Sequence, residues 1–108
     1  MKRGDIVLCA DRAADFTAKP RPVLIVQKSA YLTNKESIIV CPISTVLVDD
    51  ELSFRIQPTA SNGLHQPSEI RADKVSTVKK SRIGDCIGAL TSDEMLRLDD
   101  ILRDWLAL

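Results

Sequence analysis

Lys19-Pro20-Arg21-Pro22-Val23-Leu24-Ile25-Val26 is the stretch of sequence that decides the fold. A short run of β-branched and aliphatic residues behind a proline is typical of a buried strand. Pro22 excludes a helical backbone at Arg21, and Pro20 restricts the approach to it. We therefore predict a buried strand over residues 23–26, with an extended and poorly mobile arginine at its start.

Further short strands are predicted on both sides of this run. Residues 5–9 and 37–41 are apolar, whereas residues 52–56 alternate apolar and polar side chains and predict a strand with one wet face. Pro42 is expected to end the strand over 37–41, because proline has no N–H for the ladder. The remaining predicted elements are an irregular loop over 10–20, a connection over 28–35, an Asn62-Gly63 turn, one or two strands within 68–78 and a last strand over 86–88.

A helix is predicted to close the chain. Thr91-Ser92-Asp93-Glu94 has the spacing of a capping box, in which the threonine and the glutamate exchange hydrogen bonds at a helix start. Apolar residues then recur at helical spacing and form one face: Met95, Leu98, Ile101, Leu102 and Trp105. Strands first and a helix last predict a mainly β domain over residues 1–108, with five to seven short strands closed into a small barrel that the helix covers.

Composition limits the classes of function. The 108 residues contain 15 Lys and Arg against 15 Asp and Glu, and this balance argues against a general nucleic-acid binder. Residues 91–108 hold five acids and two bases, so the rest of the chain, with 13 bases against 10 acids, is mildly basic. No apolar run reaches the roughly 20 residues of a membrane span, and no signal peptide is visible, so we expect a cytoplasmic protein.

Metal or redox chemistry is not expected. Cys9, Cys41 and Cys86 are far apart without zinc-ligand spacing, and the single His65 cannot complete a site. Cys9 and Cys41 lie in apolar runs and are interpreted as small buried hydrophobes. We therefore predict no metal and no small-molecule cofactor.

Two groups of polar residues sit next to predicted strands. An extended Arg21 can donate two hydrogen bonds from its planar fork to one phosphate, although an edge-strand salt bridge would place it equally well. Ser44 and Thr45 follow the strand over 37–41 and could hold a phosphate or a ribose hydroxyl; the alternative is a turn closed by their side chains.

Arg71 and Asp73 form a third group. Residues two apart on a strand face the same side, so the two side chains are expected to lie next to each other. Attack of an RNA 2′-hydroxyl on its own phosphate needs a proton acceptor, a proton donor and a cation, and an Asp–Arg pair with a second arginine supplies these without metal. An exposed cross-strand ion pair is the structural alternative.

Taken together in their order along the chain, these motifs resemble the MazF/PemK/Kid toxin family. The segments that carry the resemblance are Arg3-Gly4-Asp5-Ile6-Val7, Arg21-Pro22-Val23-Leu24-Ile25-Val26-Gln27, Cys41-Pro42-Ile43-Ser44-Thr45, Arg71-Ala72-Asp73-Lys74-Val75-Ser76-Thr77 and Ser81-Arg82-Ile83-Gly84, followed by the closing helix. The resemblance covers nearly the whole chain.

The resemblance implies an SH3-like barrel of the CcdB/MazF type and a homodimer. It also implies a type II toxin, neutralised by a cognate antitoxin protein, that cuts single-stranded mRNA at specific sequences without metal and leaves 2′,3′-cyclic phosphate and 5′-hydroxyl ends. By position it implies catalytic roles for Arg21, Ser44, Arg71 and Asp73. The substrate-binding residues expected beside them are Lys19, Thr45, Phe54, Arg55, Lys74 and Lys79.

The sequence also departs from the family. The loop over residues 15–20 is short and lacks the histidine that the Kid branch carries there, and Ser76 replaces a family arginine. His65 lies in the Asn-Gly loop and is expected at the surface, within possible reach of RNA. A non-enzymatic toxin that binds a protein, like the CcdB gyrase poisons, and a catalytically degenerate family member are therefore the alternative functions.

Overall fold

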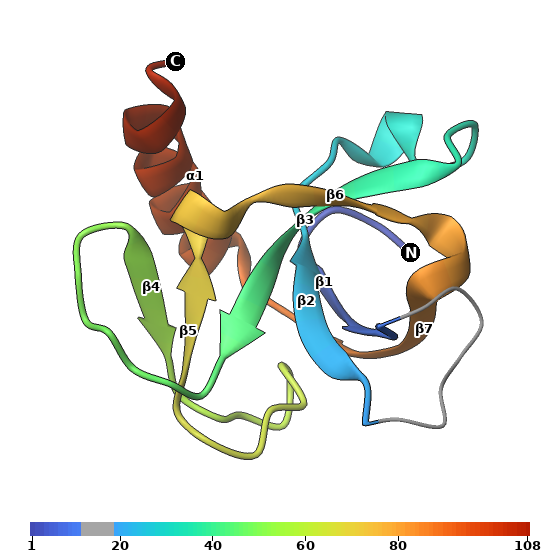
Figure 1. Cartoon of the computed structure of the whole chain (residues 1–108). Coiled ribbons are helices and arrows are strands. Elements are labelled where there is room, and N and C mark those ends of the chain that lie inside the picture. The colour runs from blue at the N-terminus through green and yellow to red at the C-terminus, as the bar shows by residue number, and fades with distance from the viewer. Residues whose placement is uncertain (12–18) are drawn as a thin grey trace.

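The computed structural model describes residues 1–11 and 19–108. Within them the chain forms seven strands and one C-terminal α-helix, which confirms the predicted mainly β class (Figure 1). Three single turns of 3₁₀ helix, η1 (Ser29–Tyr31), η2 (Ala72–Lys74) and η3 (Lys80–Arg82), connect strands. The regular elements are β1 (Asp5–Cys9), β2 (Arg21–Ile25), β3 (Ser37–Ser44), β4 (Ser53–Ile56), β5 (Ser68–Arg71), β6 (Ser76–Lys79), β7 (Ile83–Ala89) and α1 (Ser92–Leu106).

The described strands form one antiparallel sheet of order β4-β5-β3-β2-β1-β7, with β6 added to β3. Strand β3 has two partners along one edge, since residues 37–40 pair with β6 and residues 43–44 pair with β5. The sheet therefore branches at β3, and Figure 1 shows β4 and β5 on one side of it and β1, β2 and β7 on the other. Because of this branch the sheet is not closed into a barrel, and the predicted closure is wrong.

Pro42 lies at the branch and does not end its strand. It pairs with Val23 of β2, and β3 continues to Ser44. On the other edge it falls between Val40, the last residue paired with β6, and Ile43, the first paired with β5. The proline thus marks a change of partner, which corrects the predicted strand end at residue 41.

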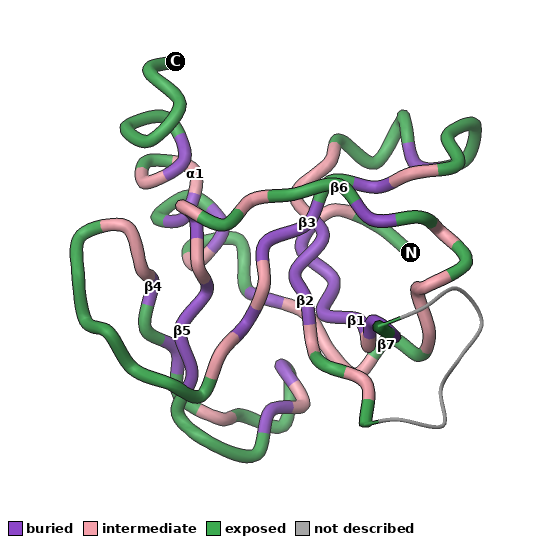
Figure 2. The backbone as a smooth tube through the Cα atoms, in the orientation of Figure 1, coloured by how far each residue is buried: buried purple, intermediate pink, exposed green. Residues whose placement is uncertain are grey.

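Both faces of the central strands are buried, as Figure 2 shows for β1, β2 and β3. Ile6 and Leu24 face a core that the helix covers, whereas Val7, Val23 and Ile25 face a second core inside the curl of β1, β2, β3 and β6. Side chains alternate between faces along a strand, so a strand buried on both sides must be apolar throughout. This explains the continuous apolar run after Pro22.

The predicted helix start is confirmed. The Thr91 hydroxyl accepts a hydrogen bond from the Glu94 N–H at 3.2 Å, and the Thr91 N–H donates to the Glu94 carboxylate at 2.9 Å. Leu98 is fully buried, but Trp105 is 46% exposed because the last turn of α1 extends beyond the sheet. In the described part of the chain, no helix has the length and apolar character needed to cross a membrane.

Candidate active site

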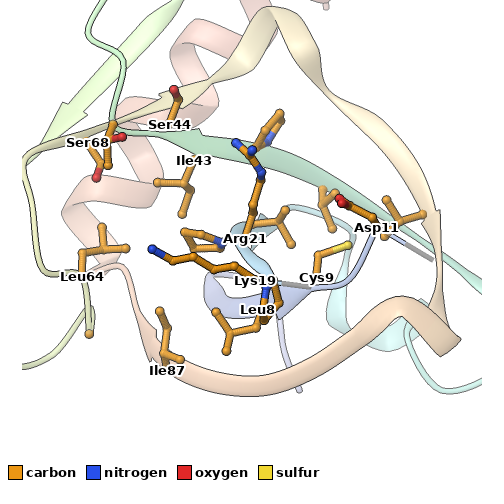
Figure 3. Close-up of a pocket in the computed structure, with 18 of the residues that line it drawn as sticks. Leu8, Cys9, Asp11, Lys19, Arg21, Ile43, Ser44, Leu64, Ser68 and Ile87 are labelled. Carbon is orange, nitrogen blue, oxygen red and sulfur yellow. The ribbon is translucent and has the colours of Figure 1, made fainter. Parts of the chain in front are cut away.

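A pocket of about 740 Å³ opens where the start of β2, the end of β3, the β4–β5 loop and β7 come together (Figure 3). This volume is in the range of ligand-binding clefts. Its apolar walls come from core strands, and its polar groups come from strand ends and loops. The pocket contains four of the residues that the sequence predicted: Lys19, Arg21, Ser44 and Thr45.

Arg21 is the first residue of β2 and lies opposite Cys9 of β1 in the ladder. Its backbone is held by that ladder and by Pro22, while its side chain is exposed and extends into the pocket (Figure 3). With the carboxylates of residues 1–11 and 19–108 it makes no ion pair. The described residues therefore do not provide the salt bridge that was the structural alternative.

Cationic side chains predominate in the pocket. Lys19 and Arg21 both point into it (Figure 3). Arg82 of η3 also lines it. Arg82 is fixed in place because its Nε donates a hydrogen bond to the carbonyl of Ala10 at 2.6 Å. Asp11 is the one carboxylate among the described lining residues. Three cations against one anion favour binding of a negatively charged ligand, and the arginine forks match phosphate oxygens.

Hydroxyl groups occupy the side of the pocket formed by β3. Ser44 ends the strand and Thr45 follows it. The Ser44 hydroxyl accepts a hydrogen bond from the Val46 N–H at 3.0 Å, so it closes the turn as the structural alternative proposed, while the residue also lines the pocket. Ser68 and Ser76 also line the pocket and were not predicted as site residues.

Arg71 and Asp73 do not form the predicted pair on a strand face. Strand β5 ends at Arg71, and Asp73 lies in η2, where the chain turns from β5 toward β6. The chain leaves the strand at Ala72, which is fully buried and whose carbonyl accepts a hydrogen bond from the Val75 N–H at 3.2 Å within η2. Neither Arg71 nor Asp73 lines the pocket.

The other predicted substrate-binding residues also lie outside this pocket. The Phe54 ring is 6% exposed in the core, with the Arg97 guanidinium 5.0 Å from its centroid, so it offers no free face to a base. Arg55 makes ion pairs of 3.3 Å with Asp49 and Glu69. Lys74 and Lys79 are exposed on η2 and β6. Most of the loop over residues 15–20 lies outside the described residues.

His65 is exposed, as expected for a surface loop residue, and it lines the pocket from the β4–β5 loop. Buried Asn62 holds this loop: its Oδ1 accepts from the N–H groups of Thr59 and Leu64 at 3.0 Å each, and its Nδ2 donates to the Gln57 carbonyl at 2.8 Å. The Asn-Gly dipeptide predicted the turn but gave no signal for what the loop packs against. His65 and Asp11 supply an imidazole and a carboxylate to this pocket, two groups that can transfer protons near neutral pH.

Two of the three cysteines, Cys9 and Cys41, are buried, and Cys86 is exposed. Burial raises the pKa of Cys9, with Arg82 opposing this in part, and burial raises the pKa of Cys41 to about 12. A raised pKa lowers the thiolate fraction at neutral pH, and Cys86 alone of the three is exposed.

We expect iodoacetamide to modify Cys86 first, as one added group by intact-protein mass spectrometry. Equal labelling of all three thiols in folded protein would contradict this burial.

Fold and site together define a small, mainly antiparallel β protein with a cationic, hydroxyl-bearing pocket of the kind that can bind phosphate. Residues 2–106 match the family model described as "PemK-like, MazF-like toxin of type II toxin-antitoxin system". The chain therefore belongs to the PemK/MazF-like toxins, and the resemblance noted from its motifs is confirmed.

Individual relatives agree with this assignment. The chain is 39% identical to the "Probable endoribonuclease MazF" of Mycolicibacterium smegmatis, over all of this chain and 98% of that protein. Its fold is similar to the "Mycobacterium tuberculosis toxin MazF-mt6", with a TM-score of 0.81 and 25% identity over 96% of this chain and 97% of that one. It is also similar to an "Endoribonuclease in complex with its cognate antitoxin from Mycobacterial species", with a TM-score of 0.80 and 22% identity over 100% and 96% of the two chains.

Proposed function

We propose that this toxin is a metal-independent, sequence-specific endoribonuclease that cuts single-stranded mRNA. The observation that carries the proposal is the position of Arg21, which extends into a cationic pocket that Ser44 and Thr45 also line. The name of the 39% identical relative supports the same activity.

The reaction we propose is transfer of the phosphate to the neighbouring 2′-hydroxyl. The 2′-oxygen bonds to phosphorus and the bond to the 5′-oxygen breaks, which leaves a 2′,3′-cyclic phosphate and a 5′-hydroxyl. Arg21 stabilises the negative charge of the phosphorane, and Ser44 and Thr45 orient the phosphate or the ribose. Lys19 adds attraction for the RNA backbone.

Proton transfer requires two groups within reach of that phosphate. Arg71 and Asp73 matched the family's acid and base by position, but in one chain they do not line the pocket that holds Arg21. We therefore assign proton removal and delivery to Asp11 and His65, which do.

The proposed partners are single-stranded RNA, a cognate antitoxin protein and a second copy of the chain in a homodimer, in the cytoplasm. The similar structure of an endoribonuclease with its antitoxin supports the antitoxin. No small-molecule cofactor enters the proposed mechanism.

Cleavage in EDTA tests the function. The purified chain is incubated with a long RNA in excess EDTA, and primer extension maps the new ends. We expect cuts at one short recurring sequence and 5′ ends that polynucleotide kinase labels without prior phosphatase treatment. Dependence on added magnesium, or an intact RNA, would contradict the proposal.

A further inference from the structure

The loop over residues 45–50 connects the pocket to an unusual buried carboxylate. Thr45 and Val46, at the start of the loop, line the pocket beside Ser44, the last residue of β3. Three apolar side chains of the loop are exposed to solvent. Val46, Leu47 and Val48 are 69%, 42% and 50% exposed. Burial of side chains therefore does not hold this loop in place, and its position must come from other contacts.

Glu69 of β5 supplies those contacts. It is 1% exposed, and its two carboxylate oxygens each accept a backbone hydrogen bond from the loop. The Val48 N–H donates to Oε1 at 2.7 Å and the Asp49 N–H donates to Oε2 at 2.9 Å. Hydrogen bonds to an ionised, buried acceptor are stronger than neutral ones, so this pair anchors the loop.

Two arginines complete the cluster. Arg55 donates to Glu69 Oε2 at 3.3 Å, and the Nε of Arg71 lies 3.6 Å from Oε1. Arg71 also donates from Nη2 to the Val46 carbonyl at 2.5 Å, so it holds the loop directly as well as through Glu69. Burial alone would raise the pKa of Glu69, but the Val48 and Asp49 N–H groups and Arg55 outweigh it and lower that pKa. Glu69 therefore stays ionised, as its role requires.

We propose that Glu69 and Arg71 are positioning residues that clamp the loop over residues 45–50 and thereby set the Ser44–Val46 side of the pocket. This inference rests on the proposed ribonuclease function. It gives Arg71 a role in holding the loop. The cationic residues Lys19, Arg21 and Arg82 lie outside the clamp, so RNA binding survives when the clamp is broken.

Glu69→Gln tests the clamp. The glutamine side chain places an NH₂ group where a carboxylate oxygen accepted a hydrogen bond from a loop N–H, so two donors face each other. The change also removes the negative charge that lies beside Arg55 and Arg71. We expect kcat to fall on the order of 10²-fold with little change in KM, because misplaced hydroxyls affect the transition state more than binding. We also expect the Val48 and Asp49 amides, protected from hydrogen exchange in the parent, to lose that protection.

Two further variants keep the test decisive. Glu51→Gln makes the same chemical change at an exposed carboxylate beside the clamped segment. We expect it to leave kcat and the hydrogen exchange of the Val48 and Asp49 amides unchanged. If Glu69→Gln does not fold, Val48→Pro removes one donor of the clamp from a half-exposed residue, and the same loss of kcat is expected.

The outcomes separate the two proposals. Faster exchange at Val48 and Asp49 with an unchanged kcat overturns the positioning role, and unchanged exchange in Glu69→Gln overturns the clamp itself. A parent chain that does not cut RNA overturns the proposed function and the catalytic part of this inference with it. An active parent with an equally active Glu69→Gln variant overturns the inference alone.

Discussion

Replacing Arg21 by alanine is expected to lower the rate of RNA cleavage by this toxin about 10²–10³-fold while leaving its fold intact. The side chain is exposed and makes no contribution to either core, so its removal leaves β2 and its ladders unchanged. The pocket loses the planar guanidinium group that would bind the phosphorane, and loss of one such donor group lowers kcat by about 10²–10³-fold. Initial rates on an oligonucleotide with one cleavage site measure the loss, and a thermal melt checks the fold.

Two variants show whether the effect is specific to the guanidinium. Arg21→Lys keeps the charge without the planar fork, so its rate should lie between those of the parent and the alanine variant. Lys35→Ala removes an exposed cation that does not line the pocket, and this variant should cut at the parent rate. Cleavage by Arg21→Ala within a fewfold of the parent would remove Arg21 from the mechanism.

Local sequence was sufficient to predict most of the elements. The apolar run after Pro22 and the Thr91 capping box each depend on residues within a few positions, and both are confirmed. The branch at β3 was not predictable. The alternation of side chains along a strand tells which face of the sheet each one occupies, but not which strand pairs with it. Pro42 illustrates this: its missing N–H indicated a strand end, but the strand continues with a different partner.

The site was predictable where its residues adjoin strand ends. Lys19, Arg21 and Ser44 lie next to apolar runs whose directions bring them to one pocket. That His65 lines the same pocket was not predictable from local sequence, because its place depends on how a loop packs against a distant strand. The expected placement of Arg71 and Asp73 side by side on one strand was wrong, because the chain enters η2 at buried Ala72, and a small apolar residue gives no local signal of that turn.

The second large effect is expected at Gly88, where the β4–β5 loop packs against β7. A Cβ at Gly88 would lie 2.4 Å from the Asn62 carbonyl carbon and from the Ser61 carbonyl oxygen, both of which are backbone atoms. The same approach leaves a Cβ at Gly63 only 2.1 Å from the Ile87 oxygen. Gly88→Ala must therefore push the loop away, weaken the Ala89 N–H bond to Ser61 and expose the hydrogen bonds of buried Asn62.

We expect Gly88→Ala to lower the free energy of unfolding by about 3 kcal/mol and the Tm by roughly 10–20 °C. Cys86→Ala, an exposed position on the same strand, should stay within about 0.5 kcal/mol of the parent. Thermal melts compare the two, and cleavage is measured below both melting temperatures.

Because this loop brings Leu64 and His65 to the pocket, folded Gly88→Ala protein should also cut more slowly than Cys86→Ala. An unchanged Tm would mean that the loop does not pack this closely, whereas a lowered Tm with full activity would take His65 out of the proposed proton transfer.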